Sequence, residues 1–236
     1  MSRTKHTISS PKPIVFSIEE NISYGEGEDR NTTILLHTLS TLFPEGEKLF
    51  VKAVRHYQHL IDRDSSLGED IRKFIGQEAH HSIAHDKLNK ELYDKLGVYD
   101  PTKALQFWLG GLLKTSPRLS LHITCCLEHW TATLARQILD NEYPLTISQQ
   151  ALWNTHAREE IEHEAVAYDV LIQTSKRPRL EALACKALFL PISLIFITAT
   201  AIMYVINGGH VDSRLFLSLS KNIPTLLKWL DPEYRP

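Results

Sequence analysis

Hydrophobic residues recur every three to four positions along almost the whole chain, which is the spacing of one face of an α-helix. Few stretches alternate between apolar and polar residues in the way that half-buried strands do. The pattern therefore predicts an all-α fold, and Pro44 is expected to end or kink the helical pattern near the N-terminal end. The expected helical segments cover residues 31–43, 44–61, 65–96, 101–113, 118–140 and 148–175.

These segments fit one helical domain, because 236 residues can form a single sizeable core. We divide the chain into a flexible N-terminal tail over residues 1–20, a helical bundle over 21–180, and a C-terminal part over 181–236. The last part begins with an apolar helix and ends in a polar tail. The tract KRPR, residues 176–179, is expected to link it to the bundle.

Residues 187–206 contain no charged side chain and are apolar all round. About 20 residues are enough to cross a bilayer, and a cytoplasmic anchor would be preceded by cations such as Lys176, Arg177, Arg179 and Lys186. The alternative is a buried helix that covers the core or a pocket of the bundle. The sequence leaves both readings open, and under either we expect a hydrophobic substrate.

Composition narrows the class of partner and the compartment. A formal net charge of -2 gives no basic field, so nucleic acid is not an expected partner. Cys125, Cys126 and Cys185 form no CxxC motif and cannot all pair, which fits a reducing compartment. The first residues have no apolar core of a secretory signal. We expect a cytoplasmic protein, with the inner face of the membrane as an alternative location.

The run THAREEIEHEAVAYD, residues 155–169, carries the first candidate chemistry. At about 100° per residue, His156, Glu160 and His163 fall on the apolar stripe of a helix within roughly 60° of one another. The neighbouring acids Glu159, Glu162 and Glu164 lie at its edge or beyond it. We expect those three to face water or to hold the inward groups in position.

Three other helices repeat this arrangement. Glu78, His81 and His85 share a face with apolar residues in the segment 65–96. Glu128 is the only acidic residue between Asp100 and Asp140, and its face is otherwise small or apolar. Glu47 likewise lies among apolar residues. An ionised carboxylate in an apolar interior costs several kcal/mol unless it is paired or binds a metal.

The spacing of these groups indicates that they share metal ions as a common partner. Glu47 and Glu78 are 31 positions apart, Glu128 and Glu160 are 32 apart, and a histidine follows each second glutamate after three residues. A four-helix bundle that combines two such halves binds a pair of iron or manganese ions. The predicted metal ligands are Glu47, Glu78, His81, Glu128, His156, Glu160 and His163. Glu159 would position a ligand, and His85 would either do the same or act as an eighth ligand.

Three stretches, LSTLFPEGEKLFVKAVRHY, IRKFIGQEAHHSIAHDKLNKEL and HAREEIEHEAVAYDV, resemble a bacterial family of predicted metal-dependent hydrolases. This family is placed among ferritin-like folds, and the resemblance runs from about Thr33 to Asp169. It implies a ferritin-like four-helix bundle with additional helices, and it implies a metal site more firmly than it implies hydrolysis.

The third stretch is also similar to that of di-iron N-oxygenases, which oxidise p-aminobenzoate to p-nitrobenzoate. In those enzymes a further histidine, one turn before the Glu-x-x-His motif, binds iron. The resemblance places that histidine at His156. It covers the ligand pattern only and does not transfer the substrate.

Two enzymatic hypotheses follow. The first is a di-iron oxygenase or oxidase, with two iron ions (or manganese, or one of each) and O2 as co-substrate, acting on a hydrophobic small molecule. The second is a hydrolase in which a hydroxide bridging two metals attacks an ester or phosphate. Iron storage or a structural metal is the non-enzymatic alternative. A small-molecule substrate, membrane contact through residues 187–206 and a homodimer are the partners that we consider.

Overall fold

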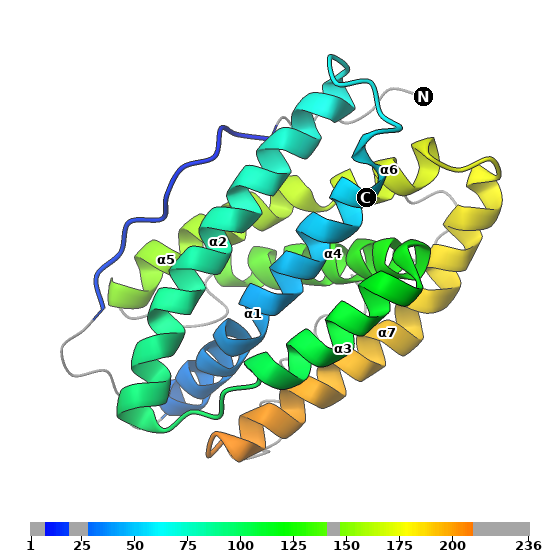
Figure 1. Cartoon of the computed structure of the whole chain (residues 1–236). Helices are drawn as coiled ribbons and strands as arrows, with labels where there is room; N and C mark the ends of the chain where they lie inside the picture. The colour runs from blue at the N-terminus through cyan, green and yellow to red at the C-terminus, as the bar shows by residue number, and fades with distance from the viewer. Residues whose placement is uncertain (1–7, 19–27, 141–146, 210–236) are drawn as a thin grey trace.

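The computed structural model describes residues 8–18, 28–140 and 147–209, and all the regular secondary structure in these ranges is helical (Figure 1). The all-α fold predicted from the sequence is confirmed. The helices are α1 (Glu28–Gln58), α2 (Ser66–Leu96), α3 (Thr102–Thr115), α4 (Pro117–Leu139), α5 (Ile147–His163), α6 (Val166–Gln173) and α7 (Pro178–Ile206).

The core of the fold is a bundle of four helices, α1, α2, α4 and α5, which α6 extends. Helix α1 packs against α2 and α4, α4 packs against α5, and α2 contacts both α5 and α6. Helix α3 crosses α1 and α4, whereas α7 covers α4 and α6 (Figure 1). The predicted four-helix bundle with additional helices is therefore what the chain forms.

Local signals set several helix boundaries. The Ser65 hydroxyl accepts a hydrogen bond from the Gly68 amide at 3.1 Å and so caps the start of α2. Gly97 ends α2 in the left-handed conformation at φ 63°, which glycine adopts without strain. Pro117 and Pro178 occupy the first turns of α4 and α7, where a missing N–H has no cost.

Helix α1 runs through Pro44, so this proline does not end a helix, and the alternative, a kink at Pro44, stays a prediction. An interior proline costs about 3 kcal/mol. Phe43 and Leu49, on either side of it, are buried in two different hydrophobic clusters. Burial of α1 on both sides of the proline therefore keeps the helix continuous.

The segment predicted as one helix over 148–175 is instead divided into α5 and α6. Ala165 keeps right-handed backbone angles of φ -93° and ψ -20°, so the chain changes course without reversing. At the interruption, the Glu164 carboxylate is bound by His129 and Arg136 of α4. No glycine or proline marks this point in the sequence.

The N-terminal residues 8–18 have no helix but are tied to the bundle. Ile8 is buried, and the Ser9 amide donates a hydrogen bond to the Glu162 carboxylate at 2.7 Å. The Pro11 ring packs directly against Gly76 of α2. A Cβ atom added to Gly76 would lie 2.5 Å from the Pro11 ring. Residues 8–18 therefore lie against the bundle, whereas the flexible tail expected over residues 1–20 stays a prediction; the rest of that tail lies outside the described residues.

Helix α7 is buried on one face only. Its most apolar 18-residue stretch is 28% buried, and among the described helices only α7 has the length and composition to cross a membrane. Helix α7 therefore lies on the surface of the bundle, where it is neither enclosed by the other helices nor separated from them. The predicted C-terminal tail, within residues 210–236, lies outside the described residues.

Of the three hydrophobic clusters among the described residues, two flank a polar layer. One contains Leu49, Phe74 and Leu121, and the other contains Leu39 and Trp153. On α1, Glu47 lies between residues of these two clusters, whereas on α4 Glu128 follows residues of the first cluster and comes six positions before Leu134 of the second. The candidate site is therefore enclosed by apolar side chains at both ends.

Candidate metal centre

Seven buried carboxylate and imidazole side chains occupy the polar layer, and they are the seven that the helical faces predict. None is more than 3% exposed. They are Glu47 of α1, Glu78 and His81 of α2, Glu128 of α4, and His156, Glu160 and His163 of α5. Their common burial agrees with the inward faces derived from helical geometry, whereas their role as metal ligands stays a prediction.

The side chains gather into two groups that could each hold a metal ion. In each group, one ligand atom from every residue lies within 4.8 Å of the others. The first group is Glu78, His81, Glu160 and His163, and the second is Glu47, His85 and His156. Glu128 belongs to neither group. Each group therefore combines residues from both halves of the site that the sequence spacing predicts.

Glu128 has no hydrogen-bond partner for either carboxylate oxygen among the described residues, whereas Glu78 lies 2.6 Å from Nδ1 of His163. Burial, together with the charges of Glu78 and Glu160, raises the pKa of Glu128 well above its ordinary value. Burial also raises the pKa of Glu78. An unpaired carboxylate in a closed interior is costly, and a bound cation is the partner that would relieve Glu128.

Glu160 lies between the two groups. Its Oε1 atom is 2.9 Å from Nε2 of His156, 3.4 Å from Nδ1 of His81 and 3.7 Å from Nδ1 of His163. Burial alone would raise the pKa of Glu160, but these imidazoles bring it well below its ordinary value. The carboxylate is therefore ionised and is placed where it could contact two ions.

His81 and His163 each direct one ring nitrogen inward and use the other outside the cluster. Nε2 of His81 lies 2.7 Å from a carboxylate oxygen of Glu159, to which it donates. Nε2 of His163 donates to the amide oxygen of Gln77 at 2.8 Å, and the Gln77 NH2 group donates to Glu162. The inner Nδ1 atoms face the candidate carboxylates: Nδ1 of His163 lies 2.6 Å from Glu78, and Nδ1 of His81 lies 3.4 Å from Glu160. Outer bonds of this kind orient histidine ligands in metal sites.

Without metal, His81 and His163 can each bind a proton at the position where a cation would be held. Burial would lower the pKa of His163, but the adjacent Glu78, 2.6 Å from its Nδ1 atom, raises this pKa to about 10. The pKa of His81 is likewise raised well above its ordinary value, against the effect of burial, by Glu159 and Glu160. Without metal, the site therefore holds extra positive charge as bound protons.

A chain of hydrogen bonds fixes the tautomer of His156. The Asn89 NH2 group donates to the Ser40 carbonyl, so its side-chain oxygen accepts the Ser40 hydroxyl proton at 2.6 Å. Ser40 Oγ must then accept from Nδ1 of His85 at 2.8 Å, which leaves Nε2 of His85 to accept from Nδ1 of His156 at 2.7 Å. Burial lowers the pKa of His156 to about 4, so its ring is neutral near pH 7.

Nε2 of His156 faces the Glu160 carboxylate at 2.9 Å. Both ring nitrogens of His85 have partners, which suits a residue that orients His156. His85 also belongs to the second candidate group, so its two predicted roles, positioning residue or eighth ligand, both stay predictions. The donor set therefore fits a pair of divalent cations.

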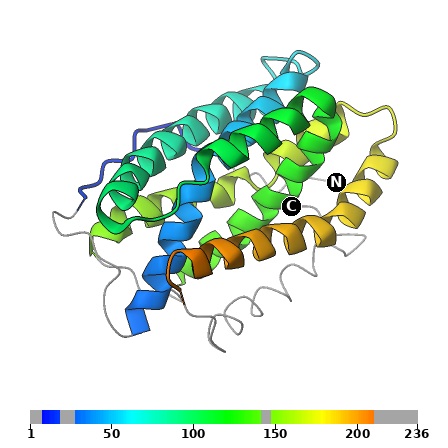
Figure 2. The same ribbon diagram turned by 60° about the horizontal axis from the view of Figure 1, so that its bottom comes forward.

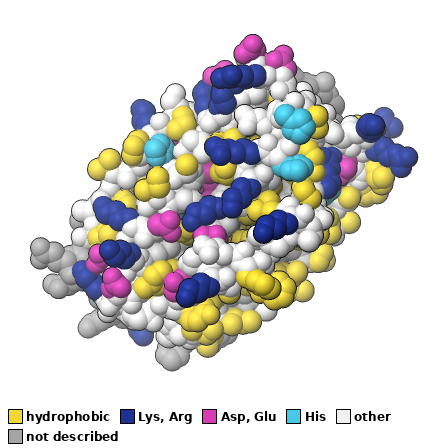
Figure 3. Space-filling view, in the orientation of Figure 1, with side chains coloured by type: hydrophobic (Ala, Val, Ile, Leu, Met, Phe, Trp, Pro, Cys, Tyr) yellow, Lys and Arg dark blue, Asp and Glu magenta, His cyan; other side chains and the backbone are white. Residues whose placement is uncertain are grey.

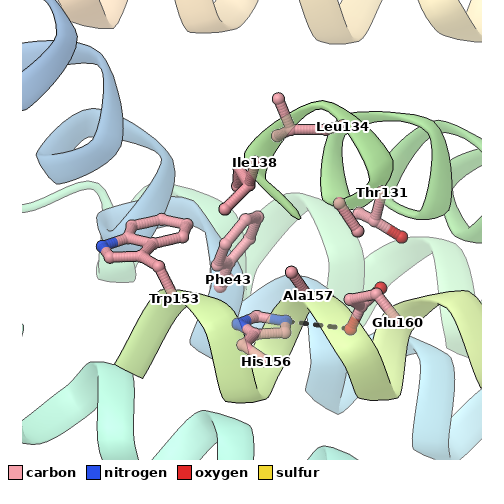
Figure 4. A pocket seen from close by; sticks show the side chains of 9 residues that line it. Phe43, Thr131, Leu134, Ile138, Trp153, His156, Ala157 and Glu160 are labelled. Carbon is pink, nitrogen blue, oxygen red and sulfur yellow. Dashed lines mark hydrogen bonds and ion pairs between the residues drawn. The ribbon is translucent and has the colours of Figure 1, made fainter. Parts of the chain in front are cut away.

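A small apolar pocket adjoins this end of the site (Figure 4). It has a volume of about 20 Å³, and His156 and Glu160 form its polar side. The remainder of the lining is Phe43, Thr131, Leu134, Ala135, Ile138, Trp153 and Ala157. A space of this size holds about one water molecule, or a molecule of similar size.

The three flanking acids of α5 are less exposed than the sequence suggests. Glu159 and Glu164 are buried, so the expectation that they face water is wrong for both. Glu159 has the alternative role, since it holds His81. Hydrogen bonds to His129 and Arg136 lower the pKa of Glu164 to about 2, against the effect of burial. Glu162 is half-buried and binds Ser9.

Several residues that hold the candidate ligands were not identified from the sequence. They are Gln77, Ser40, Asn89 and Ser82, whose hydroxyl donates to Glu47 at 2.8 Å. Ser40 lies seven residues before Glu47 and Asn89 lies four after His85, which are spacings that share a helix face. A search for small polar residues on the ligand faces would have found these two.

The comparisons with known proteins give one match. A family model described as "Predicted metal-dependent hydrolase" matches residues 12–236. No curated protein matches the chain, and no solved structure matches it.

Proposed function

The chain belongs to the family of predicted metal-dependent hydrolases, and on that premise we propose that it is a hydrolase with a dinuclear metal site in the polar layer of its bundle. The observation that carries the proposal is the shared position of Glu160 between two buried Glu/His groups. An ester or a phosphate ester is the class of substrate that such a site would hydrolyse.

The seven buried side chains, from Glu47 to His163, would bind two divalent cations. When bound, these cations supply Lewis-acid activation of a water molecule and of the substrate oxygen. Glu160 would contact both ions, and Glu128 would relieve its own unpaired charge by binding one of them. His85 and Glu159 would fix the orientation of His156 and His81.

The surrounding side chains would control water. The pocket beside Glu160 admits about one water molecule, and Phe43, Leu134 and Ile138 would exclude others from it (Figure 4). His156 keeps its proton on Nδ1, bonded to His85, so Nε2 stays available on the pocket side. A larger substrate would require these apolar side chains to move.

A second candidate is a di-iron oxygenase or oxidase, which uses two iron ions and O2. The observation that favours it is the pocket itself, because an apolar space of about 20 Å³ next to carboxylate and imidazole donors suits a small uncharged molecule such as O2. The substrate would again be a hydrophobic small molecule.

One experiment distinguishes the two candidates. Metal-free protein is loaded with Mn²⁺ or Zn²⁺ and assayed against nitrophenyl esters and phosphate diesters; in parallel it is loaded with Fe²⁺ without oxygen and then exposed to air. Hydrolysis that requires metal and is lost in Glu160→Gln, but retained in Glu162→Gln, supports the proposal. Oxygen uptake with a new visible absorption band, and no hydrolysis, would replace it with the oxygenase.

A further inference from the structure

Helix α7 is apolar on its exposed face as well as on its buried one. The buried face combines Phe189 and Met203 with Ser193 and Thr200, whose hydroxyls have no hydrogen-bond partner among the described residues. The exposed face is apolar at helical spacing along its whole length, and its large residues are Leu180, Leu183, Leu190, Leu194, Ile195, Ile202, Val205 and Ile206, each between 49% and 69% exposed. Water is a poor solvent for such a face.

Helix α3 adds to the same kind of surface. It has no buried residue, and Phe107 and Trp108 are each 72% exposed. Figure 2 shows both α3 and α7 on the near side of the bundle. In Figure 3, hydrophobic side chains gather along the side of the molecule where Figure 1 places these two helices. We call the exposed apolar residues of α3 and α7 the apolar face.

The charges next to the apolar face are mostly cationic, and the exposed acid beside α3 is Asp100. The charged residues of α3 are Lys103 and Lys114. Lys176, Arg177 and Arg179 are exposed where α7 begins. The acid of α7, Glu181, is directed to the bundle, where it binds Arg118 and His122. Exposed cations beside an apolar surface complement anionic lipid headgroups.

Helix α7 does not reach the bilayer by crossing it. It packs along its length, from Cys185 to Tyr204, against the rest of the bundle, including α1 and α4. A spanning α7 would draw α1 into the hydrocarbon, and α1 carries exposed charges such as Lys52 and Arg55. A helix held in this way can only lie in the plane of the interface.

We propose that the apolar face rests on the surface of an anionic lipid bilayer, with α7 lying in the interface and Trp108 at headgroup depth. The bundle then stays in water on the other side of the helix. This proposal does not depend on whether the metal centre hydrolyses or oxidises its substrate.

Vesicle sedimentation tests the proposal. The full chain is mixed with vesicles of phosphatidylglycerol and phosphatidylcholine, or of phosphatidylcholine alone, at low and high salt. We expect binding to the anionic vesicles, weakened by salt, and a loss of at least about tenfold in Leu190→Glu/Leu194→Glu. Ile83→Glu is the matched control, because Ile83 of α2 is 65% exposed and lies outside the apolar face.

Fluorescence locates the contact. Trp130 and Trp153 are buried, and Trp229 lies outside the described residues, so the measurement uses a Trp229→Phe background. In that background brominated lipid should quench Trp108, and the further change Trp108→Phe should remove most of the quenching. Unchanged quenching in that variant would overturn the role of α3. Absence of binding to anionic vesicles by folded protein overturns the proposal, and a dimer that Leu190→Glu/Leu194→Glu dissociates would assign the apolar face to a second copy instead. Equal binding to both vesicle types would overturn the role of the cations.

Discussion

Removal of metal should make the stability of this protein fall as the pH rises above 6.5. The reason lies in His163, whose pKa is raised to about 10 by Glu78, against an ordinary value of 6.5 for histidine. Between these two pKa values the folded, metal-free protein holds a proton that the unfolded chain releases, so unfolding becomes easier as the pH rises. His81 has a raised pKa and acts in the same direction.

The size of the effect follows from linkage. One retained proton changes the free energy of unfolding by about 1.4 kcal/mol per pH unit, so His163 alone should cost roughly 1.5 kcal/mol between pH 6.5 and 8. The raised pKa values of Glu47 and Glu128 add a loss of the same sign. The lowered pKa of His156, about 4, affects stability only below pH 6.5 and does not interfere.

Urea unfolding with chelator, followed by far-UV circular dichroism between pH 6.5 and about 8.5, measures this slope. Bound metal requires deprotonated ligands, so loaded protein should lose the slope and gain stability. Glu78→Gln removes the carboxylate that holds the proton on His163 and should flatten the slope in metal-free protein. A free energy of unfolding that stays constant or rises over this range, without metal, would refute the reasoning.

Three further outcomes are expected. Glu47→Ala should lose one of two bound ions and Glu160→Ala both, as measured by elemental analysis of purified protein, because only Glu160 lies between the groups; equal losses would contradict this geometry. His85→Leu should weaken metal binding by about 10- to 100-fold in a titration while two ions still bind at saturation, since His85 orients His156. Phe43→Ala should cost about 3–5 kcal/mol in urea unfolding, because the Phe43 ring packs against His85 and His156 inside the core; a change below about 1 kcal/mol would show that the ring is not needed there.

Helical periodicity was enough to predict the all-α bundle and the burial of the candidate ligands. An isolated acid such as Glu128, among small and apolar residues, has few physical explanations, and its counterparts on other helices narrow them further. The path of α1 through Pro44 could not be predicted, since it depends on packing at both sides of the proline. No residue near Ala165 predicts the division between α5 and α6. The division coincides with the contact between Glu164 and His129 of α4, which only the folded chain brings about.

Contacts between helices could not be predicted from the sequence either. His156 is oriented by His85, which belongs to a helix 71 positions earlier, and His163 by Gln77, 86 positions earlier. Only the folded chain brings such residues together. The position of residues 187–206 was undecided for a different reason: a helix that is apolar all round gives no periodicity from which the buried face could be read.

The two metal groups draw on α1, α2 and α5, and their ligands extend from residue 47 to residue 163. During synthesis, neither group can be complete until α5 has left the ribosome and has packed against the first hairpin. If the two groups bind metal as proposed, the choice between metals would therefore be made after most of the chain has been translated. Metal availability at that moment, as well as ligand chemistry, would set which ions the bundle encloses.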